Sequence, residues 1–263
     1  MSDQIVFFGS SPFSAPVLQK LVDAKVDVKA VVTQPDKPVG RHLRLTPNPV
    51  KVLAQKNNIP AFDSPTASIH HLESNIIGLV AAYGQIIPQT VLDAFGGHIY
   101  NIHPSLLPKY RGPSPLQQQI LDDVKETGVT IIQLDAQMDH GPIIATARDT
   151  IRLDDTTISL GNRLFALGTD LILNSQFSIF NQIPIPQNHK QATYTKLLTR
   201  KDGFLPWEKF QQLIDSTRYH YDPHSSLACL FRAYYPWPGV WTLTPQGQRV
   251  KLVSVNPPEA IFA

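Results

Sequence analysis

Cysteine and long apolar runs are scarce in this sequence. Only one of its 263 residues is cysteine, Cys229, so the chain forms no internal disulfide and offers no cysteine cluster for zinc. No apolar run approaches the roughly 18 residues that span a bilayer, and the N-terminus lacks the segments of a signal peptide. Hydrophobic residues make up 42% of the chain. Together these observations predict a cytoplasmic, globular protein that does not contact membrane.

The common cofactor-binding motifs are also missing. Only Gly9 is present where a dinucleotide-binding turn would carry three glycines, and Pro12 removes a backbone donor there. The sequence contains no phosphate-binding loop with a G-x-x-x-x-G-K-S/T pattern and no H-E-x-x-H. We therefore expect neither a bound dinucleotide nor a metal ion.

The net charge of +2 is unevenly distributed along the chain. Residues 34–57 carry a net +4, residues 58–182 a net −6 and residues 183–263 a net +4. Two basic segments therefore flank an acidic body. This pattern indicates an acidic partner such as nucleic acid, although solvated surface charge would produce the same counts.

The first 180 residues alternate short apolar runs with helix-like stretches. A helix is expected to begin near Ser14, and the other expected elements are strands at 5–8, 28–32, 76–82, 98–103, 129–134 and 143–151 and helices at 48–57, 89–95, 115–123 and 156–180. Such alternation predicts an α/β fold with a Rossmann-like, open, mostly parallel sheet and helices on both of its faces.

The remaining residues have a different character. Residues 183–203 lack apolar periodicity and are expected to be a linker. Residues 204–263 contain one short helix and strands at 240–243 and 250–255, joined by a turn at Gln246-Gly247. The expected domains are thus a catalytic domain at 1–182, a linker at 183–203 and a short β-rich domain at 204–263.

Three polar residues lie at or after the C-terminal ends of two predicted strands. Asn101 and His103 alternate along the strand at 98–103, so their side chains point the same way, and Asp139 follows the next strand. Histidine moves protons, aspartate orients it, and asparagine donates to an oxyanion. With no serine or cysteine nucleophile beside them, these residues favour acyl transfer to an external nucleophile. A buried histidine with carboxylates in loops is the alternative interpretation.

The stretch from Asn101 to Pro115, N-I-H-P-S-L-L-P-K-Y-R-G-P-S-P, resembles the folate-dependent formyltransferase family. The resemblance implies that Asn101, His103 and Asp139 are catalytic. It also implies 10-formyltetrahydrofolate as co-substrate, without a metal. The folate-binding residues that it implies are Ser105, Leu106, Leu107, Pro108, Tyr83 and Gly84.

Residues 33–51 resemble the basic loop with which the methionyl-tRNA branch of this family contacts the tRNA acceptor arm. The resemblance implies initiator methionyl-tRNA as partner, no obligatory protein partner, and tRNA contacts by Lys37, Arg41, Arg44 and Lys51. Residues 192–194 and 231–239 resemble the linker and the C-terminal β-barrel of that branch. The β-rich domain is therefore expected to be OB-like, and either compact or incomplete.

Two departures from that branch stand out. His42-Leu43 replaces the small and basic residues usual at the loop tip. His140-Gly141-Pro142 after the catalytic aspartate resembles the glycinamide-ribonucleotide branch instead. Two other functions remain open at this point: formyl transfer to a sugar amine or other small amine, and a non-catalytic protein that binds RNA or folate.

Overall fold

A computed structural model describes residues 4–39, 43–68, 76–218, 221–256 and 258–262. The chain folds into two compact units. The first comprises residues 1–111, 128–148 and 162–193, and the second comprises residues 112–127, 149–161 and 194–263. In the part of the chain that the structure describes, no helix has both the length and the apolar character needed to cross a membrane.

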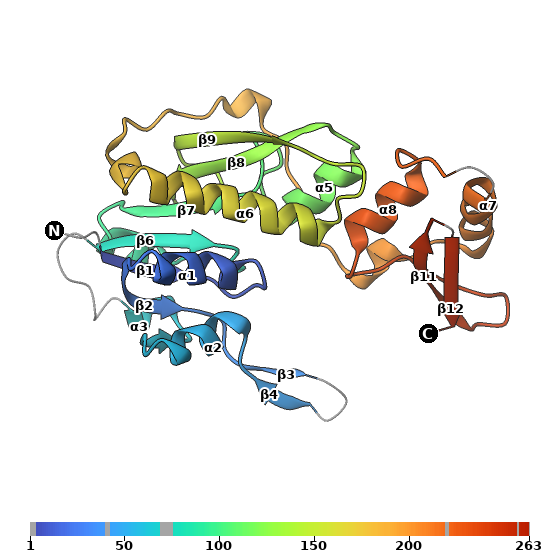
Figure 1. Ribbon diagram of the computed structural model, residues 1–263, viewed down its shortest axis with the longest axis horizontal. Coiled ribbons are helices and arrows are strands. Elements are labelled where there is room, and N and C mark those ends of the chain that lie inside the picture. The colour runs from blue at the N-terminus through green and yellow to red at the C-terminus, as the bar shows by residue number, and fades with distance from the viewer. Residues whose placement is uncertain (1–3, 40–42, 69–75, 219–220, 257, 263) are drawn as a thin grey trace. The chain divides into compact units, whose positions relative to one another are not determined.

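A seven-stranded sheet forms the centre of the first unit (Figure 1). Its strand order is β5-β2-β1-β6-β7-β8-β9, and the pairs β5–β2, β2–β1, β1–β6 and β6–β7 are parallel. The strands are β1 (Gln4–Phe8), β2 (Asp27–Val32), β5 (Ala61–Phe62), β6 (Ile76–Ala81), β7 (Ile99–His103), β8 (Glu126–Gln133) and β9 (Ile143–Thr150). The expected open, mostly parallel sheet is therefore confirmed.

Strand β8 reverses the direction of the sheet. It pairs antiparallel with β7, with Asn101 opposite Ile132 and His103 opposite Thr130. The end of β8 therefore lies beside the beginning of β7, where the amide of Leu134 donates to the carbonyl of Ile99. The segment after β8 thus starts at the edge of the sheet opposite to the one at which β7 ends.

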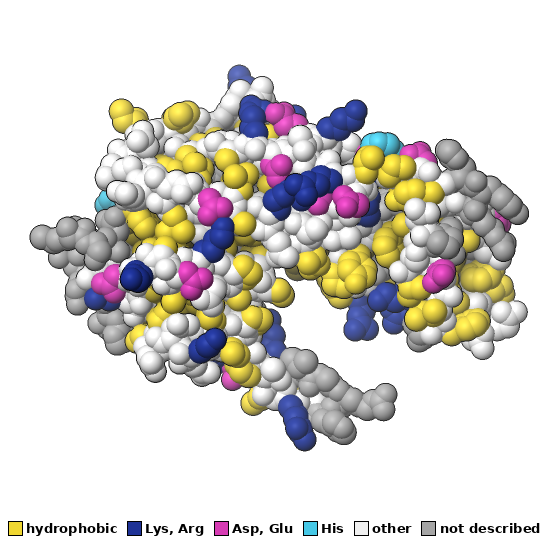
Figure 2. Space-filling model, viewed as in Figure 1, with side chains coloured by type: hydrophobic (Ala, Val, Ile, Leu, Met, Phe, Trp, Pro, Cys, Tyr) yellow, Lys and Arg dark blue, Asp and Glu magenta, His cyan; other side chains and the backbone are white. Residues whose placement is uncertain are grey.

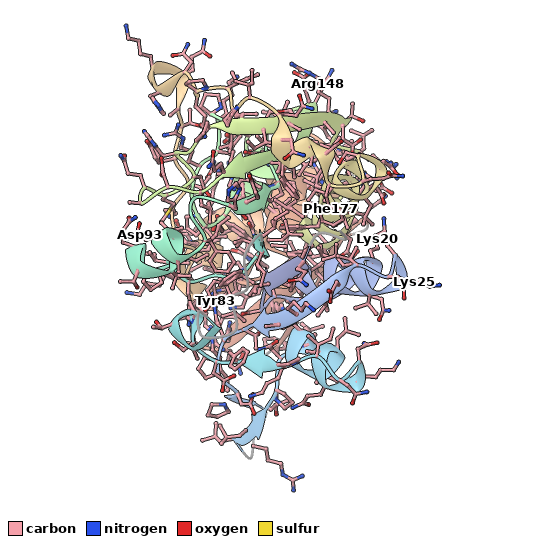
Figure 3. The ribbon with its side chains drawn as sticks, turned by 90° about the vertical axis from the view of Figure 1, so that its left-hand side faces the viewer. Lys20, Lys25, Tyr83, Asp93, Arg148 and Phe177 are labelled. Carbon is pink, nitrogen blue, oxygen red and sulfur yellow. The ribbon has the colours of Figure 1, made fainter. Side chains whose placement is uncertain are left out.

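Alternate strand residues bury their side chains in two separate layers. One buried cluster joins Phe7, Leu79, Tyr100 and Ile102 to helices α1 (Ser14–Asp23), α2 (Pro49–Lys56) and α6 (Thr157–Asn174). The other joins Phe8, Val80 and Ile99 to the segment around α4 (Gln89–Ala94). Figure 3 shows Lys20, Lys25 and Phe177 on one side of the sheet and Asp93 and Tyr83 on the other. Helices therefore cover both faces, as expected.

Two local elements differ from the expectations. The basic segment forms an antiparallel hairpin of β3 (Lys37–Val39) and β4 (Arg44–Thr46), which projects away from the main sheet (Figure 1). The last long helix, α6, ends at Asn174, because Gln176 and Phe177 adopt positive φ angles that a right-handed helix does not permit. The unit also contains the short helix α3 (Pro65–Ser68) and 3₁₀ turns at Ser178–Asn181 and His189–Gln191.

The second unit contains a three-stranded antiparallel sheet, β10-β11-β12. Its strands are β10 (Trp241–Leu243), β11 (Arg249–Val255) and β12 (Pro258–Phe262), and its helices are α5 (Pro115–Leu121), α7 (Trp207–Arg218) and α8 (Ser226–Tyr234), with a 3₁₀ turn at Arg200–Gly203. Helix α5 packs against α8, and Thr157 Oγ1 donates to the carbonyl of Ala233 over 2.6 Å. The small β-rich sheet is as expected, but two α-helices stand where the sequence predicted one.

Candidate active site

Strand β7 positions two of the three expected catalytic residues. Its alternation turns Ile99, Asn101 and His103 to one face, while Tyr100 and Ile102 enter the core on the other face. His103 is only 3% exposed. Because both residues belong to a strand that is paired on both sides, their backbone is fixed by the sheet.

Asp139 reaches these residues from the loop between β8 and β9. Its Oδ1 accepts a long hydrogen bond from Asn101 Nδ2, at 3.4 Å, and lies 3.6 Å from His103 Nδ1. Since β8 ends beside Ile99, the loop must run back along the face of the sheet to make these contacts. Asp139 has a φ of 50°, a left-handed conformation that aspartate tolerates better than most residues.

A backbone carbonyl orients the imidazole of His103. The carbonyl oxygen of Tyr110 lies 3.0 Å from His103 Nε2, and because a carbonyl only accepts, Nε2 carries a hydrogen. The other ring nitrogen, Nδ1, therefore faces the carboxylate of Asp139.

The expected folate-binding turn follows β7 and is fastened to the sheet. Thr130 Oγ1 donates to the carbonyl of Ser105 over 2.7 Å and accepts from the amide of Leu107 over 3.1 Å. Ser105 Oγ donates to the carbonyl of Lys109 over 2.8 Å. These bonds hold the turn 105–108, with Leu106 and Pro108, beside His103.

Tyr83 and Gly84 follow β6, the parallel neighbour of β7, so they leave the sheet at the edge where β7 ends. Burial raises the pKa of Tyr83 to about 12, and its hydroxyl donates to Gln85 Oε1 over 3.0 Å. Gly84 has a φ of 75°, and a Cβ there would come within 2.9 Å of Gln34 Nε2. Gln34 Nε2 also donates to the carbonyl of Tyr83, which fixes this turn.

The four expected tRNA-binding residues differ in their surroundings. Lys37 lies on β3 and Arg44 on β4 of the hairpin. Figure 2 shows a basic side chain on the projecting part of this hairpin. Arg41 lies outside the described residues. Lys51 is set back on α2, where Asp36 at 2.8 Å and Asp63 at 3.2 Å raise its pKa despite partial desolvation.

Sequence reasoning missed a polar network beside the Asp139 loop, in which Arg111 and Gln187 are buried. Gln187 hydrogen bonds with Arg111, and Arg111 Nη2 donates to His189 Nδ1 over 2.9 Å. The ring of His189 stacks on His140 with 4.1 Å between centroids. Partial desolvation, His140 and Arg111 lower the pKa of His189, and Asp135 opposes that shift. Neutral His189 can keep accepting from the guanidinium.

Within the described ranges, no group of three or more histidine, cysteine, aspartate or glutamate side chains is placed to hold a metal ion. What the site offers is a polar trio on a Rossmann-like sheet, next to an anchored turn. Such a set of groups suits the transfer of an acyl group to an external nucleophile.

The chain belongs to the formyl transferase family, whose sequence model matches residues 3–175. A methionyl-tRNA formyltransferase of Roseiflexus castenholzii is 39% identical over 97% of this chain and 80% of that protein. One from Enterococcus faecalis is 36% identical over 97% and 79%. Among solved structures, the sugar 3N-formyl transferase WlaRD has a TM-score of 0.65 at 19% identity, over 97% of this chain and 88% of that one.

Proposed function

We propose that this chain transfers the formyl group of 10-formyltetrahydrofolate to the amino group of methionyl initiator tRNA. The observation that carries the proposal is the 36–39% identity, over 97% of the chain, to proteins with the name methionyl-tRNA formyltransferase. The juxtaposition of Asn101, His103 and Asp139 supplies groups suited to this reaction. The cytoplasm, where translation starts, is the compartment that this function implies.

In the proposed reaction, the free amine attacks the formyl carbon and a carbon–nitrogen bond forms. Asn101 Nδ2 donates its second hydrogen to the carbonyl oxygen as it becomes an anion, and the positive charge of protonated His103 stabilises that anion. Asp139 holds His103 and relays the proton that the amine loses. As the tetrahedral intermediate breaks down, the bond from carbon to the folate nitrogen is cleaved, and that nitrogen takes up a proton. The turn 105–108 and the Tyr83–Gly84 segment would hold the folate.

A comparison of two formyl acceptors tests the proposal. The purified protein is given 10-formyltetrahydrofolate with methionyl initiator tRNA, or with an amino-sugar nucleotide instead. We expect formylmethionine to be released after deacylation, with kcat/KM for tRNA at least about 100-fold above that for the sugar. Efficient formylation of the sugar would favour the small-amine function. Folate binding without any transfer would indicate a non-catalytic protein.

Replacing Lys37 and Arg44 together with alanine is expected to raise the KM for tRNA and leave the KM for folate unchanged. These two residues carry charge on the hairpin, away from the catalytic trio. The slope of log KM against log salt should fall by about one for each phosphate group that the variant no longer neutralises. Steady-state kinetics at two salt concentrations measure both effects.

The matched control removes Lys25 and Lys56 together, which changes the net charge equally outside the hairpin. Its tRNA kinetics should remain those of the wild type. Equal effects in both double variants would mean that the hairpin acts only through the overall charge.

The variant Lys51→Ala should loosen the packing of α2, because Asp36 and Asp63 would lose their shared cation.

A further inference from the structure

One side chain from a distant part of the sequence reaches the loop that carries Asp139. Gln187 is 5% exposed. Its Nε2 donates to the backbone carbonyl of Asp139 over 2.9 Å and to that of Gly141 over 2.7 Å. An amide nitrogen has two hydrogens, so both are used on carbonyls that flank His140 in the chain.

The orientation of this amide is set from its other end. Arg111, which is 1% exposed, donates to Gln187 Oε1 from Nε over 3.1 Å and from Nη2 over 2.6 Å. A guanidinium only donates, so the amide oxygen must face it, and the amide nitrogen must then face the loop. Arg111 follows the catalytic strand β7 by eight residues, whereas Gln187 comes from the Pro-rich stretch beyond α6.

The loop needs such a restraint more than the strand does. Asn101 is paired to both neighbouring strands and His103 to β8, but Asp139 lies in an irregular segment with a positive φ. Its carboxylate must stay within an ångström or so of its place beside His103, because small displacements of catalytic groups lower rates strongly. Two short hydrogen bonds to the backbone on either side of His140 limit that displacement.

We propose that Gln187, oriented by Arg111, is a positioning residue that holds Asp139 in register with His103 and Asn101. This inference rests on the proposed function, in which Asp139 acts in formyl transfer. Gln187 itself does not contact the reacting atoms. Its contribution is to the geometry of the Asp139 loop, and it should therefore act on kcat and not on the KM for folate or tRNA.

The variant Gln187→Glu distinguishes an effect on the position of Asp139 from an effect on the folding of the protein. A glutamate can still accept both bonds from Arg111, so the buried guanidinium keeps its partner and the protein should fold. It carries no hydrogens for the carbonyls of Asp139 and Gly141 and repels them. We expect kcat to fall about tenfold to a hundredfold. Both KM values should change less than about threefold, and the thermal midpoint should stay close to that of the wild type.

Gln119→Ala is the matched control. Gln119 is also a buried glutamine, 1% exposed, which donates to the carbonyl of Pro115 over 2.9 Å and accepts from Thr127 Oγ1 over 2.7 Å. It belongs to the second compact unit. Its replacement should lower the thermal midpoint and leave kcat unchanged. A loss of kcat in Gln119→Ala equal to that in Gln187→Glu would overturn the inference, since general loosening would then explain both.

Hydrogen exchange provides a readout that does not depend on activity. Peptides covering residues 134–142 should exchange faster in Gln187→Glu, whereas peptides covering β6 and β7 should not change. A wild-type protein without formyl-transfer activity would refute the proposed function, and the exchange data would still decide whether Gln187 holds the loop. An active wild type with unchanged kcat and unchanged loop exchange in Gln187→Glu would refute the positioning role alone.

Discussion

Asp139→Asn and His103→Gln should each lower kcat by about two to four orders of magnitude. Asparagine keeps the size of Asp139 but removes the carboxylate that faces His103 Nδ1 and that would relay the proton lost by the amine. Glutamine keeps a donor for the Tyr110 carbonyl but cannot cycle a proton. The KM for folate should change little, because these groups act at the reacting carbon. Rapid-quench measurement of a single turnover would test the chemical step directly.

Asp135→Asn controls for the loss of a carboxylate from the same loop. Asp135 accepts from the amide of Gln137 over 2.9 Å and contacts His140 Nδ1 at 2.6 Å. Asparagine can keep the first of these bonds, and kcat should stay within about threefold of the wild type. If Asp139→Asn turned over as fast as Asp135→Asn, the catalytic assignment of Asp139 would be wrong.

Gly141→Ala should lower kcat by about 100-fold, although it adds only one methyl group. A Cβ at this position would lie 1.9 Å from the carbonyl oxygen of Gln133, which belongs to the end of β8. The obstacle is backbone, and the amide of Gln133 also bonds to the carbonyl of Pro142 over 3.0 Å. The loop must therefore shift, and Asp139 shifts with it. We also expect a loss of about 1–3 kcal/mol in the free energy of unfolding.

Gly247→Ala is a suitable comparison. Gly247 lies in the β10–β11 turn with a φ of 79°, and a Cβ there would meet nothing within 4 Å. Alanine should cost about 1 kcal/mol of stability from its backbone conformation alone, without any change in kcat. Denaturant unfolding and kinetics of both variants separate lost stability from lost geometry. Unchanged turnover in Gly141→Ala would show that the loop can move without displacing the carboxylate.

The sequence allowed prediction of the sheet and of the pair on β7. Apolar runs such as 5–8 are typical of strands that are buried on both faces, and alternation puts Asn101 and His103 on one face regardless of strand direction. The order of apolar runs also predicted that Asp139 follows the next strand in the chain. The direction of that strand, however, leaves no mark in the apolar pattern.

The structure brings Asp139 to His103 by a different route from the one that spacing suggested. Parallel strands would have put both residues at one edge of the sheet. Because β8 is antiparallel to β7, the loop instead begins at the far edge and returns across the face. A loop of this kind needs contacts along its length to hold it in place. The apolar pattern of the strands does not predict those contacts.

The contacts of Gln187 could not be predicted from the sequence for a related reason. It lies between prolines and polar residues in a stretch without apolar periodicity, which is the composition of a linker. A buried polar side chain is identified by its partners, and these come from residues 111, 139 and 141, far away in the sequence. The two proline residues at 184 and 186, which restrict the backbone before Gln187, were the one local sign of an ordered segment.

The position of Gln187 also has a consequence for the synthesis of the chain. A ribosome makes the N-terminal part first, so Asn101, His103 and Asp139 have all been polymerised well before Gln187 is added. A nascent chain that ends at residue 182 thus contains all three proposed catalytic residues without the amide proposed to hold their loop. Activity should therefore arise late in translation, when residues 187–189 have left the ribosomal tunnel and docked onto Arg111.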